Sequence, residues 1–138
     1  MLNTKLIPFL LFITLSCINC FAQTKSCDTI YDSKEIKAHY KKGERELNKF
    51  VINQLLPIIG QCQEKENYTI YSSLFMYLTI NSKGKIVDVR FTRAKLSETC
   101  KAELKKELLT MKGWQPAILN NQPVCSIYLL PIHCIKWQ

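Results

Sequence analysis

Cysteines are the residues of this chain whose chemistry is most informative. Five of the seven follow residue 22, namely Cys27, Cys62, Cys100, Cys125 and Cys134. No two of these five lie two to four residues apart, and the sequence has two histidines, His39 and His133. That spacing does not fit a structural zinc site, which takes closely spaced cysteines or histidines. We therefore expect no metal and no cofactor, and we expect disulfides if the chain enters an oxidising compartment.

Acid–base and nucleophilic catalysis find little support in the sequence. His39 and His133 could serve as general bases, but isolated histidines of this kind are more often surface residues. The sequence has no glycine-rich phosphate loop. The carboxylates that could pair in a cleft fall instead at exposed positions of expected helices: Glu44, Glu46, Glu103 and Glu107. We expect a protein without catalytic residues, not an enzyme.

The N-terminus has the pattern of a secretory signal peptide. A short basic start is followed by the apolar run LIPFLLFITLSCI (6–18), and Cys20 and Ala22 supply small residues before Gln23. The run is shorter than the roughly 20 residues that span a bilayer. We expect a signal peptide over residues 1–22 and a periplasmic or secreted protein. A retained N-terminal membrane anchor is the alternative, and lipidation at Cys17 or Cys20 is less favoured.

The remaining residues predict the elements that position these side chains. Residues 23–42 are polar and read as an N-terminal tether. Residues 43–55 carry apolar side chains at helical spacing, and Pro57 is expected to end that helix before a solvated loop at 63–67. Residues 72–80 and 86–92 predict a hairpin whose first strand is central, because it is apolar on both faces.

A second helix and a last strand complete the pattern. Ser97 can cap a helix whose apolar face includes Cys100 and Leu104, with Gly113 at its end, and a strand is expected from Val124 to Ile135. The order is helix, strand, strand, helix, strand. This predicts an α+β two-layer sandwich, with a small antiparallel sheet and helices on one face.

Composition allows one domain and gives it a basic charge. The 138 residues are 47% hydrophobic, with 19 Lys and Arg against 11 Asp and Glu, for a formal net charge of +8. The lysines of the second helix could attract an anionic partner such as lipopolysaccharide, although a solvated helix face is the favoured interpretation. Export argues against nucleic acid. These lysines are Lys101, Lys105, Lys106 and Lys112.

The segment MKGWQPAILNNQPVCSIYLLPIHC (111–134) resembles the end of a TonB C-terminal domain. The matching positions are Met111, Trp114, Pro116, Pro123, Val124, Leu130, Pro131 and Ile132. Weaker matches upstream are Gly43, Phe50, Pro57, Gly84, Ile86 and Val89. The resemblance runs from about Gly43 to Cys134, which predicts a TonB C-terminal-like domain over residues 43–138. It implies the domain alone, without the transmembrane anchor and Pro-rich linker of a full transducer. It implies a protein-binding domain that captures a peptide of an outer-membrane transporter by adding it to the last strand.

The last strand itself favours pairing with another chain. If Val124, Ser126 and Tyr128 face the helices, Ile127 and Leu129 point away from the core at a sheet edge. We expect a peptide-binding edge formed by Val124, Cys125, Ser126, Ile127, Tyr128 and Leu129. Three alternatives remain: residues 26–40 cover this surface, two copies pair through the strand, or the chain is a secreted, disulfide-stabilised binding or inhibitory module without a role in transport.

The number of cysteines after residue 22 is odd, so at least one thiol is free or pairs outside the chain. Spacing alone does not select among the possible pairings. Topology favours one of them, because Cys100 opens the second helix on its apolar face and Cys134 closes the last strand on its inward face. We expect these two ends to meet at the same edge of the sheet, and therefore a Cys100–Cys134 disulfide.

Export generates the first testable prediction. N-terminal sequencing of the exported protein should give Gln23 as the first residue, because Ala22 is the small residue best placed for cleavage after the apolar run. A protein that still begins at Met1 would establish a retained anchor, and one that begins at Cys20 would establish a lipoprotein.

Overall fold

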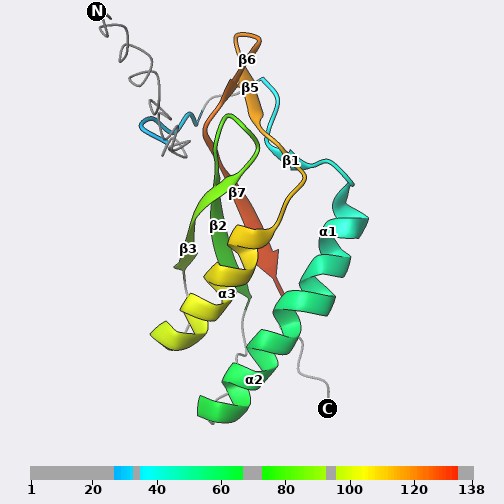
Figure 1. Ribbon diagram of the computed structural model, residues 1–138, viewed down its shortest axis with the longest axis vertical. Coiled ribbons are helices and arrows are strands. Elements are labelled where there is room, and N and C mark those ends of the chain that lie inside the picture. Colours follow the sequence, from blue (N-terminus) through cyan, green and yellow to red (C-terminus); the bar gives the residue numbers. More distant parts are fainter. Residues whose placement is uncertain (1–26, 33–34, 67–72, 93–95, 134–138) are drawn as a thin grey trace, which may run out of the picture.

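The structure, a computed structural model, describes residues 27–32, 35–66, 73–92 and 96–133. Its main elements are a long helix, made of α1 (Glu44–Phe50), η1 (Val51–Leu55) and α2 (Leu56–Glu66), then β2 (Leu74–Ile80), β3 (Ile86–Thr92), α3 (Glu98–Thr110) and β7 (Ser126–Ile132). The strands form an antiparallel sheet in the order β3-β2-β7, and the helices lie on one of its faces (Figure 1). This confirms the predicted α+β sandwich and the central position of β2. The expected signal peptide lies outside the described residues.

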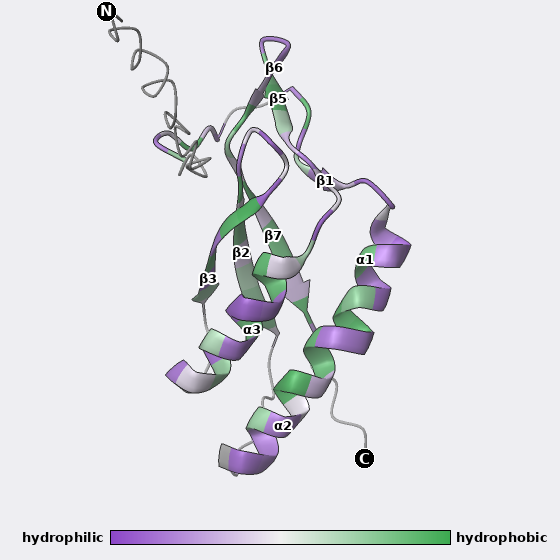
Figure 2. Ribbon diagram, in the orientation of Figure 1, coloured by the Kyte–Doolittle hydropathy of each residue, from purple (hydrophilic) through white to green (hydrophobic). Residues whose placement is uncertain are grey.

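Strand β2 forms the centre of the core. Its side chains Leu74, Met76, Leu78 and Ile80 are almost fully buried. Leu47 and Leu55 from the long helix, with Leu104 and Leu108 from α3, are buried in the same cluster. Each such side chain contributes roughly 1.5–3 kcal/mol when removed from water. Figure 2 shows the resulting contrast between the largely hydrophobic strands of the sheet and the hydrophilic tip of the β5–β6 hairpin.

Pro57 does not end the first helix, so that expectation was wrong. The helix continues to Glu66 and includes most of the expected 63–67 loop. The preceding turn, Val51–Leu55, is π-helical. Proline lacks an N–H and its ring crowds the carbonyl four residues earlier. A π turn widens the helix at that point, which accommodates Pro57 near the start of α2 without breaking the helix.

Four short strands lie beyond the main sheet. Strand β1 (His39–Tyr40) pairs with β4 (Trp114–Gln115), and β5 (Ala117–Leu119) pairs with β6 (Gln122–Val124). Asn120 and Asn121 connect β5 to β6 with φ of 51° and 59°, the positive values of a type I′ hairpin turn. The expected continuous strand from Val124 is therefore divided, with β6 ending at Val124 and β7 beginning at Ser126.

The Cys100–Cys134 pairing was wrong. Cys100 is bonded to Cys62, with Cα atoms 5.9 Å apart, and Cys27 is bonded to Cys125, with Cα atoms 5.8 Å apart. Cys134 lies outside the described residues. The error follows from the length of the first helix: because α2 continues past Pro57, Cys62 is helical and lies against the first turn of α3, at the position assigned to the end of the last strand.

Trp114 generates a prediction about stability. Its side chain is 4% exposed and lies between Tyr40 and Tyr128 at ring-centroid distances of 5.6 Å and 4.7 Å. Trp114→Ala should lower the free energy of unfolding by about 3–5 kcal/mol, because it leaves a cavity as well as losing buried area. Ile52→Ala, at a helix position that is 59% exposed, is the control and should stay within about 0.5 kcal/mol. Equal melting temperatures for both variants would contradict the packing of Trp114.

The two disulfides generate a prediction about connectivity and stability. Peptide mapping of the unreduced protein should recover a Cys62–Cys100 fragment and a Cys27–Cys125 fragment. Replacing Cys62 and Cys100 together by Ala should destabilise the protein by about 4 kcal/mol, since the bond closes a loop with a sequence separation of 38. Recovery of a Cys100–Cys134 fragment from the oxidised protein would contradict this arrangement.

Candidate functional site

Strand β7 is an edge strand, with β2 on one side and no strand pairing on the other among the described residues. The register places Pro131 opposite Phe75. In antiparallel strands, hydrogen-bonded residue pairs alternate with pairs that do not bond each other. Pro131 has no N–H, so Pro131 and Phe75 form a pair without hydrogen bonds between β7 and β2. By alternation, Leu129 and Ile127 also direct their backbone N–H and C=O groups away from β2.

The open edge has a defined beginning. The Cys125 carbonyl, two residues before Ile127, accepts a hydrogen bond from the Tyr31 N–H at 3.0 Å. This carbonyl faces the same side as the backbone groups of Ile127 and Leu129, and its partner belongs to the N-terminal segment. Ile127 and Leu129 therefore each present a backbone N–H and a C=O on the open side of β7. The open stretch is limited on one side by the Cys125 carbonyl, which is already bonded, and on the other by Pro131, which has no N–H.

The N-terminal strap, which we define as residues 27–32 and 35–40, forms one wall beside this edge. A groove of about 480 Å³ lies between strap residues Asp32, Lys37 and Ala38 and strand residues Ile127, Tyr128 and Leu129. Leu129 is 44% exposed, whereas Ile127 and Tyr128 are half-buried. An apolar side chain of an added strand could lie against Leu129 at this position.

Several bonds hold the strap in place. The Cys27–Cys125 disulfide joins its start to the residue before β7. The N–H groups of Glu35 and Ile36 donate to the Ile118 carbonyl at 2.9 and 3.2 Å, and the Ile118 N–H donates to Ile36 at 2.9 Å. Residues 35–40, which the sequence assigned to a tether, are thus paired with β4 and β5. The paired stretch within residues 35–40 is too short to show the alternating hydrophobic pattern of a strand in the sequence.

The predicted site residues are divided by the structure. Ile127, Tyr128 and Leu129 line the groove, as an open edge requires. Val124 is paired with Ala117 in the β5–β6 hairpin, Cys125 is bonded to Cys27, and Ser126 is fully buried opposite Ile80. Sequence reasoning missed Asp32 and Lys37, because nothing in their local pattern ties them to β7.

The inward side of the edge rests on aromatic packing. Tyr128 contacts Trp114 edge-to-face at 4.7 Å. Burial raises the pKa of the Tyr128 phenol, and the nearby Glu44 carboxylate raises it further. The phenol therefore stays neutral at physiological pH, so no negative charge of its own opposes a strand added beside it.

The structural residues of the C-terminal motif occupy different environments. Trp114 and Leu130 are buried in the core. Pro116 is half-buried, while Pro123 is exposed in β6 opposite Ile118 and Pro131 is exposed on β7. Pro116 lies close to Gly84 of the β2–β3 turn, so the motif connects the end of α3 to the hairpin as well as to β7.

A second hollow lies next to the groove and shares Ile127 with it. It has a volume of about 500 Å³, and its lining comes from β2, β3 and α3 as well as β7: Tyr77, Val89, Arg90, Phe91, Thr92, Lys101 and Ile127. This lining is mostly apolar with two cationic side chains, Arg90 and Lys101. It extends the apolar surface beside the open edge toward β3.

Two of the four lysines assigned to the second helix are paired, and Lys112 lies after the end of α3 at Thr110. Lys101 binds Glu98 at 2.7 Å and Lys105 binds Asp88 at 2.6 Å. The hydrogen bond from Lys105 holds the pKa of the Asp88 carboxyl below its usual value, so this pair stays ionised at neutral pH. Lys101 and Lys105 therefore contribute little unbalanced charge to the face predicted to attract anions.

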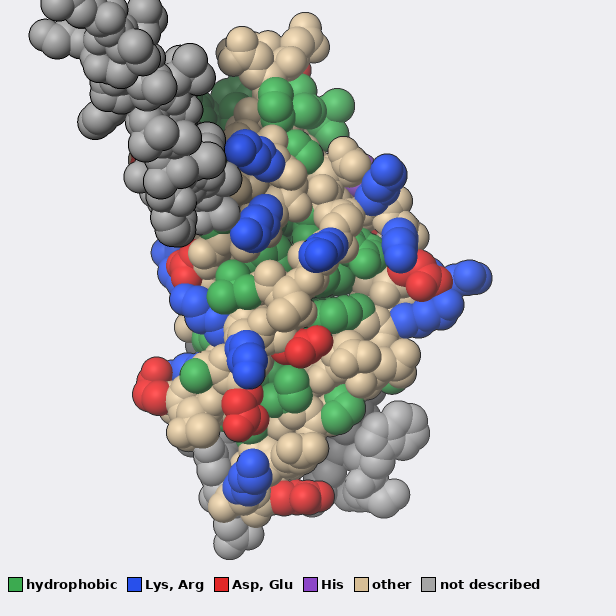
Figure 3. All heavy atoms as spheres, viewed as in Figure 1, with side chains coloured by type: hydrophobic (Ala, Val, Ile, Leu, Met, Phe, Trp, Pro, Cys, Tyr) green, Lys and Arg blue, Asp and Glu red, His purple; other side chains and the backbone are tan. Residues whose placement is uncertain are grey.

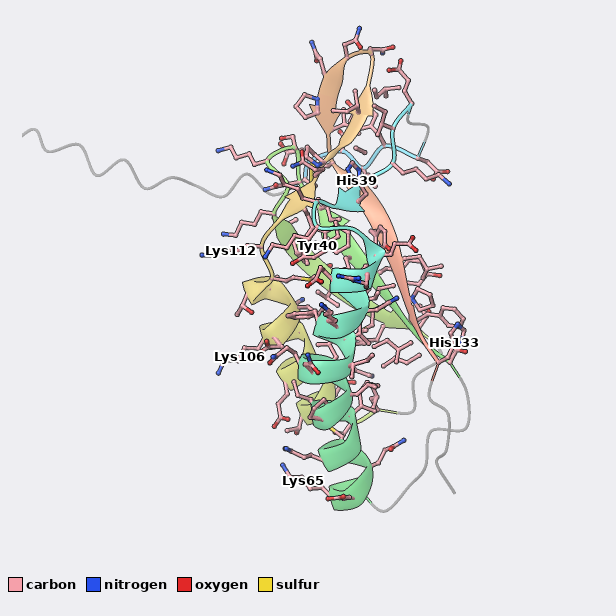
Figure 4. The ribbon with its side chains drawn as sticks, turned by 90° about the vertical axis from the view of Figure 1, so that its right-hand side faces the viewer. His39, Tyr40, Lys65, Lys106, Lys112 and His133 are labelled. Atoms are coloured by element: carbon pink, nitrogen blue, oxygen red, sulfur yellow. A yellow bond between two sulfur atoms is a disulfide. The ribbon has the colours of Figure 1, made fainter. Side chains whose placement is uncertain are left out.

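The two histidines lie apart. His39 is in β1, and His133 follows β7 at the other end of the sheet (Figure 4). The His133 Nδ1 lies 2.6 Å from the Ser73 Oγ, on the exposed surface. The described residues include no group of three or more His, Cys, Asp or Glu side chains that could hold a metal ion.

None of the helices in the described part of the chain combines the length and the hydropathy that a membrane span requires. Comparisons of the chain with protein-family models, with curated proteins and with solved structures found no match. The geometry of the β7 edge is therefore the basis for a functional proposal.

Proposed function

We propose that this chain is an exported peptide-binding domain of the TonB C-terminal type, which captures an extended peptide by adding it to β7. The observation that carries the proposal is the open edge at Ile127 and Leu129, with a groove alongside it. Edge strands with free backbone groups are templates for pairing with another chain. Backbone hydrogen bonds supply affinity in this mode, and pockets for alternate side chains supply specificity.

The edge limits the peptide that fits. Ile127 and Leu129 offer four backbone groups, and Pro131 adds a carbonyl without an N–H. Peptide side chains on the outer face would meet Ile127 and Leu129, which favours apolar residues at alternate positions. The strap prevents the added strand from continuing along Cys125, because the carbonyl of that residue already accepts a bond from Tyr31.

The resemblance to TonB C-terminal domains suggests the plug segment of an outer-membrane transporter as the peptide. A second candidate function is a secreted binding or inhibitory module that does not energise transport. The disulfides favour this alternative, because Cys27–Cys125 joins the strap to the residue before the strand that would bind the peptide. Pairing of two copies through β7 is a further use of the same edge.

Substitution of Ile127 tests the edge. Ile127→Pro removes one outward backbone donor, so it should abolish capture of transporters from an outer-membrane extract. The variant should still fold, because Ile127 directs its N–H away from β2. Pro131 shows that β7 accepts a proline at such a position. Ile127→Thr keeps the backbone donor and should weaken capture only a few-fold. Leu129→Pro is an independent second variant with the same expected result as Ile127→Pro.

Circular dichroism and thermal melting of each variant serve as the folding control. Equal capture by the wild type, Ile127→Pro and Leu129→Pro would remove the β7 edge from the mechanism. Recovery of no transporter by the folded wild type, together with edge-dependent binding of peptides from a display library, would favour the secreted binding module.

A further inference from the structure

Figure 3 shows basic side chains gathered on the upper part of the face in view, below the β5–β6 hairpin, and five exposed lysines belong to the segments that meet there. They come from three segments that are distant in sequence: the β1–α1 connection, the β2–β3 turn and the α3–β4 connection. We call this set the lysine platform, and it consists of Lys41, Lys42, Lys83, Lys85 and Lys112. Figure 4 shows Lys112 beside Tyr40, the residue before Lys41.

Backbone contacts fix the three segments against one another. The Lys41 N–H donates to the Gly113 carbonyl at 2.8 Å, which joins the first segment to the third. Gly84 has a φ of +71°, and a Cβ there would collide with the Trp114 carbonyl oxygen, so the β2–β3 turn lies directly against β4. The backbone positions of the platform lysines are therefore fixed relative to one another.

The β2–β3 turn is also held from within. The Asn81 side-chain oxygen accepts hydrogen bonds from the N–H groups of Lys83 and Lys85, both at 3.0 Å. These two bonds fix the backbone of the turn while both lysine side chains extend into solvent.

The charge of the platform is not neutralised by neighbours. Within the described residues, the salt bridges use other cations: Arg45, Lys49, Lys101 and Lys105. Glu46, on α1 next to the platform, is paired with Arg45 and Lys49. In the described part of the chain, no salt bridge involves any of the five platform lysines.

We propose that the lysine platform binds the anionic phospholipid headgroups of a bilayer. The path of the chain supports this partner. Ser126 pairs with Ile80, the residue before the turn that carries Lys83 and Lys85, so Cys125 lies at the platform end. Cys27 is bonded to Cys125, and the five residues from the expected cleavage site to Cys27 reach roughly 18 Å at most. Before cleavage, or with the retained anchor that is the alternative to it, the apolar run of residues 6–18 would therefore keep this part of the domain close to a bilayer.

The chemistry of the platform fits a surface better than a single ligand. Its members are all lysines, which act as compact point charges, whereas a single phosphate or carboxylate is typically held by the fork of an arginine. None of the five lines the groove or the hollow beside β7. Lysines close to an anionic bilayer each add about 1 kcal/mol, or about fivefold, to binding.

The test measures binding of the full exported chain to vesicles of phosphatidylcholine, with and without phosphatidylglycerol, over a range of salt concentrations. Insertion of a retained apolar segment would be little affected by salt, whereas attraction between lysines and headgroups is screened. The platform variant and its charge-matched control each lose three lysines. The platform variant is Lys41→Gln, Lys83→Gln and Lys112→Gln; the control is Lys65→Gln, Lys101→Gln and Lys106→Gln.

The wild type and the control should prefer the anionic vesicles in a salt-dependent way, and the platform variant should bind them roughly a hundredfold more weakly. Equal loss in both variants would show that net charge alone acts, and would overturn the proposal. Absence of any preference for phosphatidylglycerol would overturn it as well. So would displacement by inorganic phosphate at the concentration of the lipid, which indicates a single-phosphate site, or binding to polyglutamate but not to vesicles, which indicates an acidic protein partner.

The outcome is independent of the peptide proposal, since the platform shares no residue with the β7 edge. A platform variant that loses vesicle binding but still captures peptide separates the two surfaces. Ile127→Pro should bind vesicles like the wild type.

Discussion

The packing around Trp114 is the constraint on which both proposed binding surfaces depend. Its ring lies between Tyr40 of the strap and Tyr128 of β7, and its carbonyl oxygen abuts Gly84 in the turn between β2 and β3. One residue therefore sets the positions of three segments. The groove beside β7 requires the first two, and the lysine platform requires the first and third. Because protein interiors are close-packed, a change in volume at this position would displace both surfaces together.

The strap and the open edge form one unit. The disulfide to Cys125 and the hydrogen bond from Tyr31 close the beginning of the edge, while Pro131 removes a donor near its end. A long, uninterrupted edge invites aggregation, and shortening it is a common protection. Here the disulfide, the hydrogen bond and the proline leave open backbone groups only at Ile127 and Leu129 among the described residues of β7. The edge is thus short enough to limit non-specific pairing, while the proposed peptide would pair with the backbone groups that stay open.

Local periodicity was sufficient to predict the sandwich, because Leu104 and Leu108 repeat at helical spacing and β2 is apolar on both faces. It failed where tertiary context decides. Pro57 is accommodated by a π turn whose widening no sequence pattern shows, and that error moved Cys62 away from Cys100 and led to the wrong disulfide. The alternation of the last strand predicted that Ile127 and Leu129 point away from the core. Asp32 and Lys37, in contrast, reach the same groove through bonds between segments distant in sequence, namely the Cys27–Cys125 disulfide and the backbone hydrogen bonds of the strap. Likewise, the lysines of α3 were visible as a run, but the platform joins three separate segments.

The connectivity of the disulfides has a consequence for biosynthesis. The two bonds are nested, since Cys62–Cys100 lies within the interval closed by Cys27–Cys125. A chain that enters an oxidising compartment N-terminus first presents Cys27 and Cys62 together long before Cys125 arrives. Oxidation in order of emergence would join these two and leave both native partners unpaired. The native arrangement therefore requires either that the thiols stay reduced until α2 packs on α3, or that thiol–disulfide exchange corrects the first bond. If the chain is exported as the sequence predicts, maturation of this small domain would then depend on thiol–disulfide exchange catalysts in the receiving compartment.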